Sequence, residues 1–176
     1  MKSRNEIRRS QTYGRFNTIR TRQGSTIKHK WKMGTYRQIF YHIVFGTKYR
    51  KPTINEKNET QLYKYIWGVL NNKKCKLYRI NGMPDHIHIF CDLHPNINLS
   101  SLVKDIKVAT NLWMKESGLF PEFTGWQEGY GAFTSSIKDK ERIINYIKNQ
   151  KEHHKTETFE GEFKKLLAEH EIESFE

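Results

Sequence analysis

The sequence of 176 residues contains few cysteines, few prolines and no long apolar run. The two cysteines, Cys75 and Cys91, form no CxxC motif, so we expect reduced thiols in a cytoplasmic protein and no disulfide framework. No apolar run approaches the roughly 20 residues that cross a bilayer, and the basic N-terminus lacks the apolar segment of a secretory signal. A GxxxxGK[ST] loop is also absent, so we expect neither a membrane protein nor a nucleotide cofactor.

Acidic residues are scarce relative to basic ones. There are 19 Asp and Glu against 31 Lys and Arg, which gives a formal net charge of +12. A field of this sign attracts polyanions, so nucleic acid is the leading candidate partner. The alternative is a merely basic protein; an acidic membrane surface is less favoured, because the apolar helix faces look like core faces.

The first 34 residues differ in composition from the rest. They are rich in Arg, Lys, Ser, Thr and Asn, Glu6 is the only acid, and no helical or strand period is visible. We expect a disordered basic arm over residues 1–34 and a folded domain over residues 35–176. The arm could hold phosphates, or it could be sequence upstream of a start at Met33; both interpretations stay open.

The folded part alternates strand and helix signals. Period-2 or β-branched segments predict strands over 38–47, 75–82, 86–93 and 131–135, and period-3.6 segments predict helices over 55–72, 98–117, 136–154 and 158–169. The order β-α-β-β-α-β predicts an α+β, ferredoxin-like (split βαβ) antiparallel sheet with helices on one face and an appended C-terminal tyrosine-bearing helix. The first strand is apolar on both faces, which suggests a central position, and the second sheet face is expected to be open.

The segment "NGMPDHIHIF" carries two histidines on one predicted strand. Residues i and i+2 of a strand share a face, so His86 and His88 point the same way, and we expect that way to be outward. Two imidazoles so placed can bind one divalent cation. A lone HxH is a weak signal, and the alternative is two half-exposed histidines that hydrogen-bond their neighbours.

A tyrosine and a glutamine share one face of the helix predicted over 136–154. Tyr146 and Gln150 are i and i+4, and His153 falls on the same stripe. Such a tyrosine can lie over an active site, although taken alone it is more often an ordinary boundary residue.

Three segments in this order suggest a family. "YHIVFGTKYRKP", "MPDHIHIF" and "YIKNQKEHH" on a βαββαβ chain closely resemble the single-tyrosine HUH transposases of the insertion sequence 200/605 group. HUH denotes histidine, hydrophobic residue, histidine, here His86, Ile87 and His88. The resemblance covers roughly residues 35–169, and the basic arm before Met33 departs from the usual compact form.

The resemblance implies an enzyme that cuts and rejoins single-stranded DNA at hairpins near the ends of its element. Tyr146 matches the residue that attacks the phosphate and keeps it as a 5′-phosphotyrosine. His86, His88 and Gln150 match the ligands of Mg²⁺ or Mn²⁺. His153 is an alternative ligand, and the remaining histidines are interpreted as structural or surface residues: His42, His94, His154 and His170.

Members of this family are homodimers in which the tyrosine helix can complete the partner's site. Glycines at 125, 129 and 131 could form a hinge before that helix. We therefore expect a two-fold dimer with Tyr146 of one chain near the histidine pair of the other.

Two basic groups suit phosphate contacts. One comes directly after the first strand, the other around the second strand, and their members are Lys48, Arg50, Lys51, Lys74 and Arg79. Tyr49 and Tyr78 nearby could stack on bases. A solvated basic face is the alternative.

Three other functions compete with this interpretation. A non-enzymatic nucleic-acid-binding module on a ferredoxin-like sheet would use exposed aromatic residues rather than HxH. A domesticated single-tyrosine relative acting on repeated extragenic hairpins has the same sequence features, and only the flanking DNA separates the two. A replication initiator or relaxase would have a different strand order and further domains.

Overall fold

The computed structural model describes residues 18–20, 26–28 and 36–173, and the chain divides into two compact units between residues 37 and 38. The N-terminal unit contains two strands, β1 (Thr18–Arg20) and β2 (Thr26–Lys28), which pair antiparallel with Ile19 opposite Ile27. The sequence predicts no strand here, because three-residue strands are too short to show a period, although both contain a β-branched Thr-Ile pair. The rest of the predicted disordered arm lies outside the described residues.

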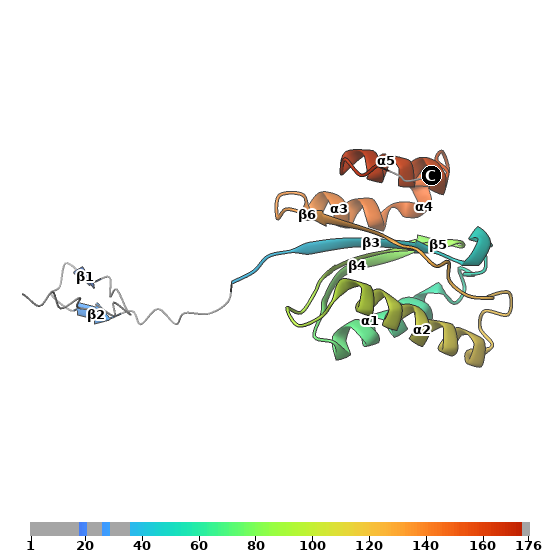
Figure 1. The fold of residues 1–176 in the computed structure, drawn as a ribbon, viewed down its shortest axis with the longest axis horizontal. Coiled ribbons are helices and arrows are strands. Elements are labelled where there is room, and N and C mark those ends of the chain that lie inside the picture. The colour runs from blue at the N-terminus through green and yellow to red at the C-terminus, as the bar shows by residue number, and fades with distance from the viewer. Residues whose placement is uncertain (1–17, 21–25, 29–35, 174–176) are drawn as a thin grey trace, which may run out of the picture. The chain divides into compact units, whose positions relative to one another are not determined.

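The second unit is built on a four-stranded antiparallel sheet (Figure 1). Its strands are β3 (Phe40–Gly46), β4 (Lys76–Met83), β5 (His86–Asp92) and β6 (Gly131–Ser135), in the order β4-β5-β3-β6. This is the α+β, split βαβ arrangement that the sequence predicts. The predicted central position of the first strand is confirmed, since β3 pairs with β5 on one side and β6 on the other.

Two helices, α1 (Glu59–Asn72) and α2 (Leu99–Ser117), cover one face of the sheet (Figure 1). The side chain of Asn98 accepts hydrogen bonds from two backbone N–H groups of α2, and Gly118 ends the helix at φ 66°, as its sequence signals predict. Alternate strand residues, such as Ile43 and Phe45 of β3, pack with both helices into the larger core.

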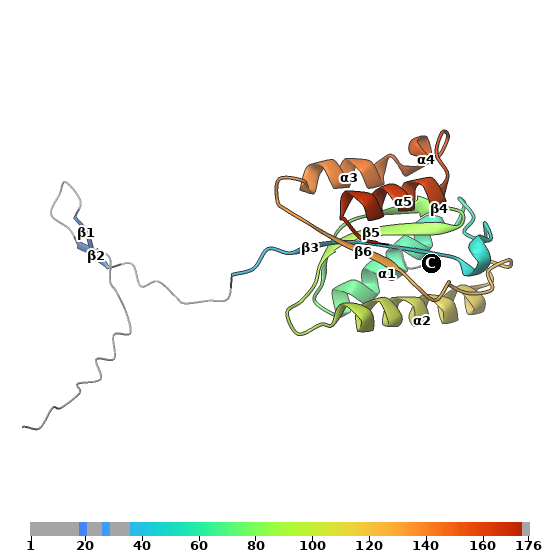
Figure 2. The same ribbon diagram turned by 45° about the horizontal axis from the view of Figure 1, so that its top comes forward.

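Three further helices cover the second face: α3 (Lys140–Lys148), α4 (Gln150–His153) and α5 (Phe159–Glu169) (Figures 1 and 2). The expectation of an open face is therefore wrong. The strands present large apolar side chains on this side too, and α3 and α5 remove them from water. The buried side chains form two clusters. One contains Phe40 and Phe90 with Ile143 and Ile147, and the other contains Val44 and Phe133 with Leu166.

The helix predicted over 136–154 is broken in two. α3 ends at Lys148, Asn149 has φ −98° and ψ 18°, and α4 begins at Gln150. Asparagine is a poor helix former, which favours the break at this position. Tyr146 and Gln150 therefore belong to different helices, contrary to the prediction.

A short 3₁₀ helix, η1 (Lys48–Arg50), follows β3. Tyr49 and Arg50 have φ of 58° and 57°, a left-handed conformation that is uncommon outside glycine. Within the described part of the chain, no helix has both the length and the apolar character that spanning a membrane requires.

Candidate active site

The two histidines of β5 lie between the sheet and the C-terminal helices. Their exposed fractions are 1% for His86 and 0% for His88. The sequence predicts that they face solvent, and this prediction is wrong. Each ring is held through Nδ1: that of His86 lies 2.7 Å from Asp85 Oδ1, and that of His88 lies 2.9 Å from His42 Nε2. Both Nε2 atoms are thereby left free of these contacts.

Asp85 is in turn fixed by Arg50. The guanidinium donates a 2.5 Å hydrogen bond to Asp85 Oδ2, and its carbon lies 3.4 Å from the centre of the Phe159 ring on α5. Burial alone would raise the pKa of Asp85, but the hydrogen bond from His86 and the charges of His86 and Arg50 together outweigh it, so the pKa lies below its ordinary value. Arg50 thus holds Asp85, and Asp85 holds His86. This series of contacts resembles the carboxylate–histidine pairs that orient metal ligands.

Tyr146 lies near the end of α3 with its ring 6.2 Å from the rings of both His42 and His88. Its hydroxyl donates a short hydrogen bond to Glu162 Oε1 on α5. Burial, and then the hydrogen bond to the Glu162 carboxylate, raise the pKa of Tyr146 above its ordinary value. In this state the phenol keeps its proton.

Glu162 contacts residues of both the sheet and the C-terminal helices and is 1% exposed. Its Oε1 accepts from Tyr146 and, at 2.7 Å, from Gln150 Nε2. Its Oε2 lies 3.0 Å from His154 Nε2. Burial alone would raise the pKa of Glu162, but hydrogen bonds, first from His154, outweigh it and hold the pKa well below its ordinary value.

Three buried polar atoms of this cluster have no hydrogen-bond partner among the described residues: His86 Nε2, His88 Nε2 and Gln150 Oε1. They belong to the three residues that the resemblance nominates as metal ligands. Burial, the largest cause, lowers the pKa of His86 to about 4 and lowers that of His88, so both rings are neutral at pH 7. Neutral imidazoles with free nitrogens are the form that binds a cation, so these residues fit a divalent metal.

A group suited to a metal extends beyond the nominated ligands. One ligand atom from each of four residues lies within 4.8 Å of the others, and these residues are His86, His88, His154 and Glu162. The sequence interpretation missed the last two. One signal was present: Glu162 falls on the apolar stripe formed by Phe159, Phe163 and Leu166, and a carboxylate on a buried stripe needs buried partners.

The structure thus brings together Tyr146, His86, His88 and Gln150 within one chain, whereas the sequence interpretation expected Tyr146 beside the histidines of a partner. His153, the alternative ligand, lies outside the group and contacts Glu157 Oε2 at 3.0 Å. His42 and His154 were interpreted as structural or surface residues, but both contact members of the cluster.

The predicted basic groups lie apart. Lys48 and Lys51 are exposed beside Asp85, at the His86 end of β5, while the exposed Lys74 precedes β4 near the Asp92 end. Arg79 is half-buried on β4 opposite Phe90. Arg50 is engaged by Asp85, so its position is that of a structural support for the site.

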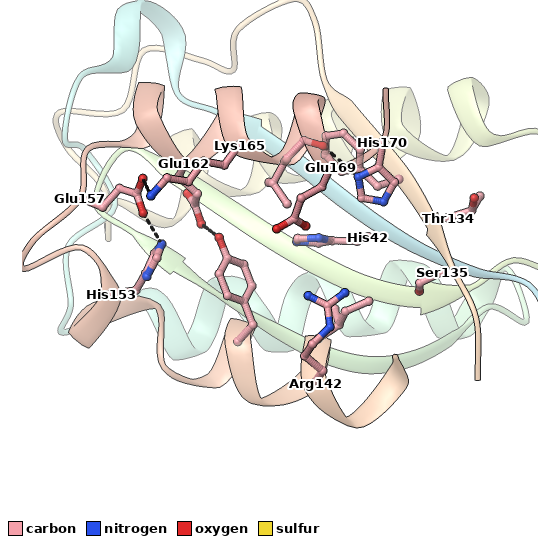
Figure 3. Close-up of a pocket in the computed structure, with 14 residues that line it drawn as sticks. His42, Thr134, Ser135, Arg142, His153, Glu157, Glu162, Lys165, Glu169 and His170 are labelled. Atoms are coloured by element: carbon pink, nitrogen blue, oxygen red, sulfur yellow. Dashed lines mark hydrogen bonds and ion pairs between the residues drawn. The ribbon is translucent and has the colours of Figure 1, made fainter. Parts of the chain in front are cut away.

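A pocket opens beside Tyr146 between α3, α5 and β6 (Figure 3). Its lining carries carboxylates, among them Glu157 and Glu169, and two exposed cations, Arg142 and Lys165. Both cations are paired with carboxylates, Arg142 with Asp139 and Lys165 with Glu157.

Comparison with known proteins identifies the family of the chain. The chain is 27% identical over 120 residues to the transposases for insertion sequence element IS200 of Salmonella typhimurium (strain LT2) and Salmonella typhi; the match covers 65% of this chain and 78% of each relative. A candidate transposase structure from Deinococcus radiodurans R1 shares the fold, with a TM-score of 0.54, 24% identity, and coverage of 69% of this chain and 98% of that one. Residues 35–150 match the family model for IS200-like transposases, and the chain belongs to this family.

Proposed function

We propose that this protein cuts and rejoins single-stranded DNA at hairpins near the ends of a mobile element, through a covalent 5′-phosphotyrosine on Tyr146. A divalent cation, Mg²⁺ or Mn²⁺, would be held by His86, His88 and Gln150. Membership of a transposase family supports strand cleavage and transfer in general, and the arrangement of the site supports this particular chemistry.

One observation carries the proposal: each of the three nominated ligands buries a polar atom that has no hydrogen-bond partner among the described residues, and all three residues surround the carboxylate that the tyrosine hydroxyl contacts. A buried polar atom without a partner costs about 1–3 kcal/mol. Three such atoms in one place are costly unless a ligand satisfies them, and two imidazole nitrogens and an amide oxygen together suit a cation.

The chemistry requires a bond between Tyr146 Oη and phosphorus while the bond from phosphorus to the 3′ oxygen breaks. The Tyr146 hydroxyl hydrogen bond directs the phenol proton toward the Glu162 carboxylate, whose lowered pKa makes it a hydrogen-bond acceptor rather than the final base. The released 3′ oxygen takes up a proton and becomes a hydroxyl. When bound, the cation supplies positive charge to the phosphate oxygens. Because the phosphotyrosine conserves the phosphodiester energy, rejoining needs no nucleotide cofactor.

DNA binding is supported by the charge of the chain. Lys48 and Lys51 lie beside the histidine end of the site, and Lys74 and Arg79 form a separate basic group toward the Asp92 end of β5. The N-terminal arm, whose residues 1–32 contain ten Lys and Arg, would add affinity that falls with salt. We also propose a homodimer, in line with the resemblance; sedimentation at micromolar concentration tests it.

The decisive experiment incubates the full-length protein with single-stranded DNA from the flanks of its gene and Mg²⁺ or Mn²⁺, followed by a denaturing gel. The wild-type protein should form a protein–DNA adduct. Tyr146→Phe should form none while binding the same DNA within about twofold, because the ring is retained and only the nucleophilic oxygen is lost.

Tyr130→Phe is the matched control, since it removes a hydroxyl outside the site and should leave the adduct unchanged. An adduct formed by Tyr146→Phe would exclude Tyr146 as the nucleophile. DNA binding by the wild type without any adduct would favour the non-enzymatic nucleic-acid-binding module.

A further inference from the structure

The segment that follows Tyr146 contributes two side chains to the proposed metal site. His154 comes directly after α4, and Glu162 lies in the first turns of α5. Neither belongs to the HUH strand or to the tyrosine helix. His154 and Glu162 could either pack against the metal ligands or bind the cation themselves.

The distances favour binding. Glu162 Oε2 lies 3.6 Å from His86 Nε2, 3.5 Å from His88 Nε2 and 3.0 Å from His154 Nε2. Ligand atoms about 2.0–2.1 Å from a tetrahedral ion are about 3.3 Å apart, so the three separations from the carboxylate oxygen suit a four-coordinate site, and all four ligand atoms lie within 4.8 Å of one another. The imidazole nitrogens of His86 and His88 approach the carboxylate without hydrogen-bonding to it and stay without partners among the described residues.

We infer that in the DNA-free protein His86, His88, His154 and Glu162 bind a single divalent transition-metal ion in a closed four-coordinate site. The inference rests on the proposed metal site and changes its ligand set for this state. Gln150 is not one of these four residues: its Nε2 donates to Glu162 Oε1, and its amide oxygen has no hydrogen-bond partner among the described residues. Three imidazoles and one carboxylate suit Mn²⁺, Co²⁺ or Zn²⁺ better than Mg²⁺, which prefers oxygen ligands.

The two carboxylate oxygens of Glu162 contact different groups. Oε2 faces the imidazoles, whereas Oε1 receives the hydrogen bonds of Tyr146 and Gln150. A metal bound in this way ties α5 to the sheet and holds the tyrosine hydroxyl one carboxylate away from the ion. Glu162 therefore also positions Tyr146.

The test uses metal-free full-length protein titrated with Co²⁺, whose visible absorption is strong in four-coordinate and weak in six-coordinate sites. The wild type should show strong absorption. Glu162→Gln and His154→Gln should each weaken binding by at least the roughly tenfold that loss of an outer-shell partner costs, and the remaining spectrum should be weak. Glu160→Gln, an exposed carboxylate on the same helix, is the control and should behave as the wild type.

A weak wild-type spectrum would overturn the inference by itself. This part of the test does not depend on whether the variants fold. Unchanged Co²⁺ affinity and spectrum in Glu162→Gln would also overturn it. His86→Ala separates the two proposals: if this variant loses Co²⁺ while Glu162→Gln keeps it, the proposed metal site stands and only the closed ligand set fails. If His86→Ala binds Co²⁺ as the wild type does, the metal site itself fails.

Discussion

At the scale of single residues, the site is made of groups whose ordinary behaviour is changed by burial. The histidines lose affinity for protons, whereas Glu162 stays ionised because imidazole, hydroxyl and amide donors surround it. His154 is the exception among the imidazoles: burial lowers its pKa, but the hydrogen bond and charge of Glu162, with the hydrogen bond to the Glu157 backbone, together outweigh this and raise it. Neutral imidazoles beside an ionised carboxylate form a site ready for a cation.

These shifts predict a pH-dependent stability of the metal-free protein. The pKa of His86 is about 4 in the folded state and about 6.5 in the unfolded chain, so the unfolded chain binds more protons between these values. The free energy of unfolding should therefore fall as the pH is lowered from neutral, by about 2 kcal/mol at pH 5 from His86 alone. His42 and His88 act in the same direction, and His154 in the opposite one.

Urea denaturation with a chelator, near neutral pH and at about pH 5, measures this effect while Glu162 stays ionised. His86→Gln cannot titrate, so this variant should lose part of the pH dependence. Equal unfolding free energies of the wild-type protein at the two pH values would contradict the prediction.

At the scale of elements, the β4–β5 hairpin positions the histidine pair, and Gly82 allows its two strands to meet. A Cβ atom at Gly82 would overlap the carbonyl oxygen of His86 and lie 2.9 Å from Ile87 Cα. Both atoms belong to the backbone of the strand that carries the HUH motif, so they cannot move aside as a side chain would.

Gly82→Ala should therefore cost about 2–3 kcal/mol of stability and weaken metal binding, because it pushes His86 away from Glu162. Chemical denaturation and Co²⁺ titration measure the two effects. Gly68→Ala is the control of opposite sign: this glycine lies inside α1 with nothing within 4 Å of its added Cβ. It should stabilise the protein by about 0.5–1 kcal/mol, and a comparable effect of both substitutions would contradict the steric argument.

At the scale of the whole molecule, a single chain contains every residue of the proposed site. The hydroxyl of Tyr146 and the imidazoles of His86 and His88 meet at the same carboxylate of their own chain. No exchange of helices between protomers is needed to complete it. A dimer of such chains would contain two independent sites.

A mixture of Tyr146→Phe and His86→Ala proteins should therefore fail to cleave DNA, since each mutant chain lacks one part of its own site. Gel analysis of cleavage after the two variants are refolded together measures this, with mixtures of each variant and wild type as positive controls. Cleavage by the mixture of the two variants would show that tyrosine helices are exchanged between chains, as the sequence interpretation expected.

The sequence by itself determined the strand order, the central position of β3 and the shared direction of His86 and His88. These follow from local periodicity: alternation fixes the face of each strand residue, and the apolar pattern of "FYHIVF" requires burial on both sides. The two ends of α2 were likewise predictable from the sequence, because Asn98 and Gly118 cap the helix to which they belong. The resemblance also nominated residues that the fold brings together, although their roles remain proposals.

Only the tertiary structure decided what covers the second face and which side chains meet there. Glu162 is 16 residues from Tyr146 and 74 from His88, and no local pattern specifies that α5 packs over β3 and β6. That packing depends on long-range burial of apolar side chains, which brings a carboxylate among three imidazoles. The sequence therefore predicted the strand and the tyrosine, while the carboxylate that joins them emerged from the packing of the whole domain.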